Sequence, residues 1–179
     1  MMLQTVPNQR VIDTERFVLR PLCKSDQGLI DMYGGDPRVS RNTRSIPHPL
    51  PPGATEAFIA RTLAADRTED VWAMDGTKSG GSELMGLIAL ERMDRDQSEI
   101  GYWVGPAFWN TGVASAAVAG LIEANPQNSK TLFAEVFQDN AASARVLTNC
   151  GFEYLGDAET FSVARGAKVA TWTYSRKLD

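Results

Sequence analysis

A single helix-forming segment between two strand-like stretches constrains the fold of this chain more than any other feature. Residues 98–104 and 131–137 have the composition of strands, and the sequence between them predicts one helix that begins near residues 112–115 and ends before Pro126. Two strands that are joined across a helix lie parallel in the same sheet. The chain is therefore expected to contain one parallel crossover.

The other predicted strands follow one another through short turns, which favours antiparallel pairing. The predicted order is β-α-α-β-β-β-α-β-α-β-β, and residues 36–53, rich in Pro, Arg and Ser, are expected to be mostly loop. Strands are predicted at 17–22, 70–75, 83–93, 98–104, 131–137, 152–161 and 169–178, and helices at 25–33, 54–66, 112–125 and 140–150. This order predicts an α+β fold with three α/β/α layers, in which helices flank a mixed, mostly antiparallel sheet. We expect residues 13–179 to form one domain and residues 1–12 to be an N-terminal extension.

Composition excludes several classes of protein. The 179-residue chain has a net charge of −4, which argues against a broad nucleic-acid-binding surface. Cys23 and Cys150 lack CxxC spacing and His48 is the single histidine, so neither a metal site nor a histidine-based catalytic triad is expected. No apolar run approaches the roughly 18 residues that cross a bilayer, and residues 1–10 lack a secretory pattern. These features predict a soluble, cytoplasmic protein that needs no metal, membrane or nucleic acid.

The most informative segment, residues 99–115, runs from a strand through a loop into the start of a helix. A helix start presents unpaired backbone N–H groups and the positive end of the helix dipole, and both attract an anion. Gly112 and Ala114 are small enough to let a diphosphate approach the backbone closely. The same small residues would also suit a helix that packs tightly, and this segment alone does not separate the two interpretations.

A second segment, residues 139–152, predicts a helix with Asn140 as its N-cap and Gly151 just beyond its end. Ser143 lies in the first turn, where it suits a structural role as well as a functional one. Cys150 is expected to be a small buried residue rather than a catalytic thiol. The segment gains meaning when it is combined with the preceding one.

Together with the beginning of the chain, these segments resemble the GNAT superfamily of N-acetyltransferases. The most similar branch contains the RimJ/RimL-like N-terminal acetyltransferases of ribosomal proteins and their small-molecule relatives. The resemblance extends over about residues 13–178. The residues that carry it are Thr14, Glu15, Arg16, Phe17, Leu19, Arg20, Pro21 and Leu22; Glu99, Ile100, Gly101, Tyr102 and Trp103; Trp109, Gly112 and Ala114; and Asn140, Ser143, Val146, Leu147, Gly151 and Phe152.

The resemblance implies a sheet that splays open between its fourth and fifth strands, here residues 98–104 and 131–137, with acetyl-CoA as co-substrate in the cleft. The pantetheine is expected to lie beside the first of these strands as a form of strand addition. Contacts with the coenzyme are expected from Tyr102, Trp103, Val104, Trp109, Asn110, Thr111, Gly112, Val113, Ala114, Ser115, Asn140 and Ser143. The implied reaction transfers the acetyl group to a primary amine of a protein N-terminus or a small molecule, by direct attack and without a covalent enzyme intermediate.

Glu99 is the candidate general base, because several GNAT enzymes carry a base glutamate at the corresponding place. The alternative is that Glu99 is an ordinary exposed strand residue, or the ion-pair partner of an arginine such as Arg20. Ser143 is the candidate acid, either directly or through a water molecule, or a residue that only binds the coenzyme. Glu91 and Tyr102 are reserve candidates for proton transfer.

The chain departs from the family pattern at several positions. Leu147 lies where other GNAT branches have a tyrosine that protonates the leaving thiolate, and leucine has no proton to donate. Trp109, Asn110 and Thr111 replace residues that are often Gln or Arg, Gly, and basic, respectively. Fewer cations are therefore expected to face the phosphates, with a lower affinity for the coenzyme.

The acceptor site is expected to come from residues 36–53, the second helix and the hairpin near residues 161–169. Arg38, Arg41, Arg44 and His48 give this wall a positive tendency that suits a carboxylated acceptor, unless the loop is merely solvated. The protein is expected to be a monomer or a homodimer.

Two rival functions compete with acetyl transfer as interpretations of the sequence. The first is a non-catalytic acyl-CoA-binding or sensor module on the same fold. The second is a P-loop nucleotide-binding protein, against which the absence of Gly-Lys-Ser/Thr after the loop argues strongly.

Overall fold

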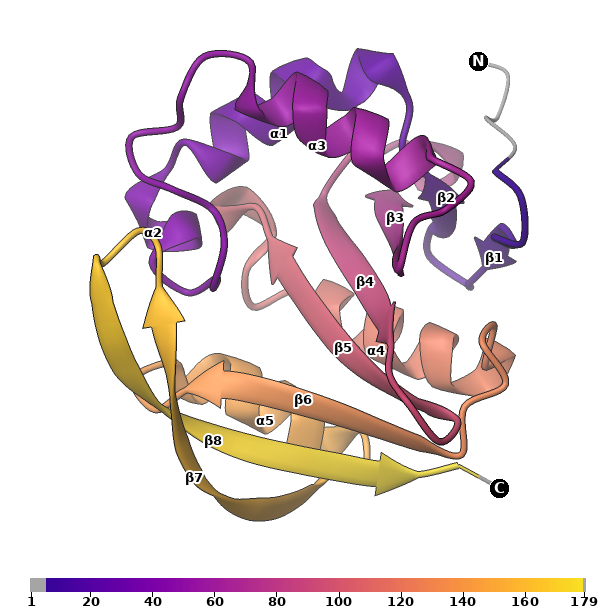
Figure 1. Ribbon diagram of the computed structural model, residues 1–179. Coiled ribbons are helices and arrows are strands. Elements are labelled where there is room, and N and C mark those ends of the chain that lie inside the picture. Colours follow the sequence, from indigo (N-terminus) through magenta and orange to yellow (C-terminus); the bar gives the residue numbers. More distant parts are fainter. Residues whose placement is uncertain (1–5, 179) are drawn as a thin grey trace.

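The computed structural model describes residues 6–178, in which eight strands form one sheet in the order β1-β2-β3-β4-β5-β6-β8-β7 (Figure 1). The strands are β1 (Ile12–Asp13), β2 (Val18–Pro21), β3 (Glu69–Asp75), β4 (Gly86–Arg92), β5 (Gln97–Val104), β6 (Thr131–Phe137), β7 (Glu153–Ser162) and β8 (Ala167–Lys177). The α-helices are α1 (Gln27–Gly34), α2 (Pro37–Ser40), α3 (Ala54–Leu63), α4 (Val113–Ala124) and α5 (Ala141–Asn149), and short 3-10 helices span Lys24–Asp26, Thr77–Ser79 and Pro106–Phe108.

Helices cover both faces of the sheet, as Figure 1 shows. Successive side chains of a strand point to opposite faces. In β3, Val71 and Ala73 therefore pack with residues of α1 and α3, whereas Trp72 and Met74 pack with residues of α4 and α5. The predicted three-layer α+β fold with a mixed sheet is confirmed.

Strands β5 and β6 are the parallel pair that the crossover helix α4 requires, and they pair over a short stretch. Gln97–Glu99 lies opposite Thr131–Phe133, and the recorded pairing extends no further toward the carboxyl ends of the strands. On its other edge, β5 is paired with β4 from Ser98 through Val104. Strand β6 is held by β8 over its whole length. Since each strand is fixed to a different neighbour, the two diverge, and the expected opening of the sheet is confirmed.

The structure adds elements that the sequence did not predict. Helix α2 forms inside the segment expected to be mostly loop, because Pro37 opens it and the Asp36 carboxylate accepts a hydrogen bond from Arg38 N (2.9 Å). Strand β1 pairs with β2. Strand β8 lies between β6 and β7, so the last strand of the chain enters the sheet interior and β7 forms its edge. Among residues 6–178, no helix is both long and apolar enough to span a bilayer.

A buried arginine fixes the amino-terminal part of the sheet. Arg20 on β2 is 1% exposed and binds both carboxylate oxygens of Asp26 at 2.9 Å. Its Nε donates to Asp75 Oδ2 on β3 (2.8 Å), and Nη2 donates to the carbonyl of Glu83 (3.0 Å). A guanidinium with this many partners ties β2, β3 and the start of α1 into one unit.

Replacing Arg20 with methionine should lower the free energy of unfolding by about 3–5 kcal/mol, because two buried carboxylates lose their counter-charge. Urea denaturation followed by circular dichroism measures the change. Lys168→Met is the control, since it removes a cation from an exposed pair with Glu159 (3.8 Å) and should leave stability close to that of the wild type. Equal stability of Arg20→Met and the wild type would contradict the role assigned to the network.

Candidate functional site

Two cavities adjoin the carboxyl-end half of β5 and share Asn42, Tyr102 and Trp103 in their lining. The first, here called the helix-end cavity, has a volume of about 420 Å³ and lies at the starts of α4 and α5. The second, here called the strand-floor cavity, has a volume of about 380 Å³ and lies over β3, β4 and β5, beneath α3. The two cavities are therefore adjacent, and ligands bound in them would lie close to each other on either side of the three shared residues.

The helix-end cavity gathers almost all the residues that the sequence analysis selected for the coenzyme. Thr111 is the exception, and its hydroxyl is engaged with the carbonyl of Phe108. The selected residues that line the cavity are Tyr102, Trp103, Val104, Trp109, Asn110, Gly112, Val113, Ala114, Ser115, Asn140 and Ser143. Segments that lie about 40 residues apart in the sequence are thus brought together by the fold.

The mouth of this cavity is suited to an anion. In the described chain, the backbone N–H groups from Asn110 to Ser115 have no acceptor within the protein, and the first helical bond runs from Ala116 N to Gly112 O (3.0 Å). Gly112 has φ of 81°, a conformation that favours glycine. The free N–H groups and the dipole of α4 both place partial positive charge at the mouth of the cavity.

Arginines from other segments also reach this mouth, and sequence reasoning missed them. Arg38 and Arg145 line the cavity, and the guanidinium of Arg38 lies 5.7 Å from the centre of the Trp109 ring. Arg16 donates to the carbonyl of Thr111 (2.9 Å). The loop itself lacks cations, as expected, but α2 and α5 bring Arg38 and Arg145 to the cavity, where Arg38 is also paired with Asp36 (2.7 Å). No local motif could have placed Arg38 there.

The carboxyl end of β5 turns backbone groups toward the gap. Gly105 N donates to Met85 O (2.8 Å) on the β4 side, and alternate residues of a strand direct their backbone groups to opposite edges. Val104 therefore faces the gap, and its carbonyl accepts a hydrogen bond from Trp109 Nε1 (2.7 Å). By the same alternation, the backbone groups of Tyr102 lie on this edge. A bound molecule can add to them as a strand would.

Tyr102, Ser143 and Asn140 form a chain of hydrogen bonds across the gap. The Ser143 hydroxyl donates to the Tyr102 hydroxyl (2.9 Å), which donates to the Ser143 carbonyl (3.1 Å). The side-chain oxygen of Asn140 accepts a hydrogen bond from Ser143 N (3.3 Å), so Asn140 is the N-cap of α5, as the sequence predicts. Burial raises the pKa of Tyr102 and keeps the phenol protonated at neutral pH. Leu147 is fully buried in the core.

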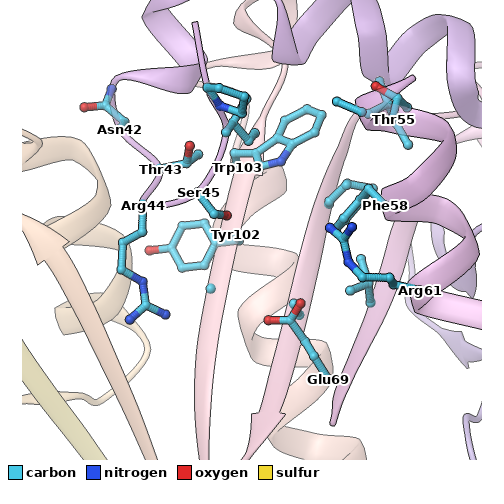
Figure 2. A pocket seen from close by; sticks show the side chains of 18 of the residues that line it. Asn42, Thr43, Arg44, Ser45, Thr55, Phe58, Arg61, Glu69, Tyr102 and Trp103 are labelled. Carbon is cyan, nitrogen blue, oxygen red and sulfur yellow. The ribbon is translucent and has the colours of Figure 1, made fainter. Parts of the chain in front are cut away.

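The strand-floor cavity is enclosed from three sides, and Figure 2 shows its lining. Residues 42–47 and helix α3 cover it, and the floor is formed by β3, β4 and β5. The remaining wall comes from β6 and β8, through Glu135, Phe137 and Thr171. Arg44 and Arg61 enter it from opposite sides, with Glu69 between them (Figure 2).

Glu99 lies in this cavity and forms an ion pair, though not with Arg20. Its partner is Arg44 from the loop after α2, at 2.9 Å. Burial is the main cause that raises the pKa of Glu99, the nearby carboxylates of Glu135 and Glu91 add to it, and Arg44 opposes the increase. Glu99 is thus a partly buried carboxylate at the cavity floor rather than an ordinary exposed strand residue.

The arginines of the predicted acceptor wall are already paired with carboxylates. The pairs are Arg38 with Asp36 (2.7 Å), Arg41 with Asp139 (3.4 Å) and Arg44 with Glu99 (2.9 Å). The wall therefore offers little free positive charge to a carboxylated acceptor. The β7–β8 hairpin supports this loop from outside, since Arg165 donates to Arg41 O (2.9 Å) and Val163 N donates to Arg44 O (3.0 Å).

A half-open pair of parallel strands thus has a helix start suited to an anion on one side and a cavity with carboxylates and arginines on the other, an arrangement that suits a protein that brings two ligands together. In the part of the chain that the structure describes, no group of three or more His, Cys, Asp or Glu side chains is arranged to hold a metal ion.

Comparison with known proteins identifies the class. The model of the acetyltransferase (GNAT) domain family matches residues 16–153, and the chain belongs to this family. The protein is therefore an acetyltransferase of the GNAT family.

Among its relatives, the uncharacterized N-acetyltransferase YoaA of Bacillus subtilis (strain 168) is 25% identical over 174 residues, which covers 92% of this chain and 95% of YoaA. Two solved structures share the fold. The microcin C7 self-immunity acetyltransferase MccE, in complex with acetyl-CoA and AMP, has a TM-score of 0.79 and 15% identity and covers 92% of this chain and 94% of its own. The ribosomal L7/L12 α-N-protein acetyltransferase RimL, in complex with CoA, has a TM-score of 0.78 and 15% identity. The match covers 95% of this chain and 99% of the RimL chain.

The ion pair at the cavity floor yields a direct prediction. Arg44→Ala should raise the pKa of Glu99 further, because the opposing cation is lost, and Glu135→Gln should lower it, because a neighbouring negative charge is lost. Titration of the Glu99 carboxyl carbon by NMR measures both changes. Lys168→Met is the control and should cause no shift. The same Glu99 titration curve in all variants would refute this electrostatic description.

Proposed function

We propose that the chain acetylates a primary amine, of a small molecule or a protein N-terminus, by direct attack of the amine on the thioester. The observation that carries this proposal is the meeting of the two cavities at Tyr102 and Trp103, where the pairing of β5 with β6 has ended. The coenzyme occupies the helix-end cavity and the amine occupies the strand-floor cavity. The resemblance to the RimJ/RimL-like branch supports an amine acceptor without fixing its size.

The coenzyme is held by two kinds of contact. Its diphosphate binds the free N–H groups from Asn110 to Ser115, with Arg38 and Arg145 as cationic partners. Its pantetheine arm adds to the exposed edge of β5 at Tyr102 and Val104. The amide of Asn140 can donate to the same arm, because its capping bond uses the side-chain oxygen and leaves the nitrogen available.

Ala114→Asp should weaken CoA binding by about 100-fold or more, because a carboxylate at the start of α4 repels the diphosphate. Ala119→Asp is the matched control, since it makes the same change at an exposed position farther along the same helix. Isothermal titration calorimetry with CoA measures both affinities. Equal weakening in the two variants would place the diphosphate elsewhere.

Proton transfer from the amine is assigned to Glu99. A neutral amine nitrogen must form the bond to the acetyl carbon while the carbon–sulfur bond breaks, so a base has to accept the ammonium proton first. The raised pKa of Glu99 makes it a stronger base than an exposed glutamate, and Arg44 still favours its charged form. Glu99 receives the proton directly or through one water molecule. Val104 N–H, on the gap edge of β5, is the candidate donor to the developing negative charge on the thioester oxygen.

The leaving thiolate is protonated by the hydroxyl pair of Tyr102 and Ser143. Ser143 and Tyr102 are hydrogen-bonded to each other, and the phenol remains protonated because burial raises its pKa. One of these hydroxyls donates its proton to the sulfur, and the other holds the donating hydroxyl in position. The pair replaces the tyrosine that other GNAT branches have at the position of Leu147.

Glu99→Gln should reduce kcat by about 100-fold and leave the CoA dissociation constant unchanged, because a general base acts in the chemical step. Steady-state kinetics of thiol release with a panel of amines, including peptides that begin with Ala or Ser, measures the effect. The control is Glu159→Gln on the exposed strand β7. Full turnover by Glu99→Gln at every pH would remove Glu99 from the role.

Ser143→Ala and Tyr102→Phe should each lower kcat more than they weaken CoA binding, because each interrupts the hydroxyl pair without removing the backbone contacts. The kcat of the double variant should be only slightly lower than that of the less active single variant, since the two hydroxyls act as one unit. A loss confined to CoA affinity would make them binding residues.

A further inference from the structure

The strand-floor cavity is acidic, although the loop above it is rich in arginine. Three carboxylates and the two guanidinium groups of Arg44 and Arg61 line it, and a fourth carboxylate, outside the lining, lies on the same face of the sheet. The carboxylates are those of Glu69, Glu91, Glu99 and Glu135. Three of them stand in one row, because Glu91 is opposite Glu69 on one side and opposite Glu99 on the other. Like charges placed directly opposite each other destabilise a sheet.

The protein does not neutralise this group by itself. Burial raises the pKa of Glu69, and the charge of Glu91 adds to the effect, while Arg44 and Arg61 oppose it. Asp70 provides the contrast, since this 1%-exposed carboxylate is bound by Arg67 (2.8 Å), Arg92 (2.8 Å) and Gln127 (2.9 Å). A structural carboxylate in this protein is thus fully paired, and those of the cavity are not.

Two buried oxygen atoms on the β6–β8 wall add an independent observation. Within residues 6–178, neither Glu135 Oε1 nor Thr171 Oγ1 has a hydrogen-bond partner, although Thr171 is only 1% exposed. Thr171 stands opposite Phe137, and Phe137 is two residues after Glu135, so both oxygens lie on the cavity face of the sheet. Buried polar atoms are rarely left unpaired, and both of these can accept a hydrogen bond.

We propose that the acceptor is an aliphatic amine with a second positive charge, which Glu135 and the Thr171 hydroxyl bind on the β6–β8 wall of the strand-floor cavity, while Glu69 on the cavity floor adds to the negative potential that favours a cation. This inference rests on the proposed function, because it assumes that the reacting amine lies where the two cavities meet. The ammonium group of the acceptor supplies the donors that the unpaired oxygens lack and compensates the excess of carboxylates.

The dimensions of the cavity suit such an acceptor. Glu135 and Thr171 lie across the gap from the carboxyl-end half of β5, because Glu99 pairs with Phe133 and both Glu135 and Phe137, the residue opposite Thr171, follow Phe133 along β6. Apolar side chains that include Val71, Leu87 and Phe58 line much of the remaining cavity. A short methylene chain can contact these side chains while its two ends are held by polar groups.

Three acceptors with similar carbon chains separate the effect of the second charge from the reaction itself. Putrescine, butylamine and γ-aminobutyrate share a reacting primary amine and end in an ammonium, a methyl and a carboxylate group. With acetyl-CoA, kcat/KM should be at least about tenfold higher for putrescine than for butylamine, and lowest for γ-aminobutyrate. Equal values for putrescine and butylamine, or a preference for γ-aminobutyrate, would overturn the proposal.

Variants of the wall test the assigned residues. Glu69→Gln, Glu135→Gln and Thr171→Val should each move the ratio of putrescine to butylamine kcat/KM toward one, and Glu159→Gln on exposed β7 should not. Glu69→Gln should also raise Tm at neutral pH, since it removes an incompletely paired charge whose pKa is raised by folding. An unchanged ratio together with a lowered Tm would assign Glu69 to the fold instead.

Binding separates a failure of this inference from a failure of the proposed function. Calorimetric titration of the CoA-bound protein with putrescine and with butylamine reports the charge preference without any turnover. Tighter binding of putrescine without acetylation of any amine would support the cation site and contradict the transferase mechanism. Acetylation of several amines with no preference in turnover or binding would support the mechanism and overturn the cation site.

Discussion

The structure depends on the early end of the pairing between β5 and β6. Backbone pairing on the outer edges holds each strand to a different neighbour, so the two diverge after Glu99 and Phe133. The divergence leaves backbone groups of β5 unpaired in the middle of a sheet, where an unmet polar group is costly. It also places the starts of α4 and α5 at one opening. The helix-end cavity, the strand-floor cavity and the place where they adjoin at Tyr102 all follow from this divergence.

The two sides of the gap differ in charge, and this difference distinguishes the two ends of the cleft. Free N–H groups and the arginines Arg38 and Arg145 face the opening at α4, whereas the carboxylates that face the cavity over β3 to β6 outnumber the arginines beside them. The acidic side is not a structural ion network, since Arg20 and Asp70 show how completely this protein pairs such groups elsewhere. An anionic co-substrate and a cationic acceptor would therefore enter from opposite sides.

Much of the fold could be read from local patterns. The limits of β6 were predicted to the residue, and α5 was predicted with its cap at Asn140 and with Gly151, whose φ is 83°, just beyond its end. Helix α2 was missed because four residues carry little periodicity, and its cap depends on the single side chain of Asp36. The place of β8 between β6 and β7 was not predictable either, because pairing order is decided by packing over the whole sheet.

The sequence by itself determined the class of protein, the crossover through α4 and the residues around Gly112 that suit an anion, since these depend on short-range spacing. Only the tertiary structure decided the partners of the charged groups. It paired Glu99 with Arg44 rather than Arg20, and brought Arg38 to the opening at α4. Electrostatic partners are set by distances between side chains that are remote in the chain, and no local pattern encodes those distances.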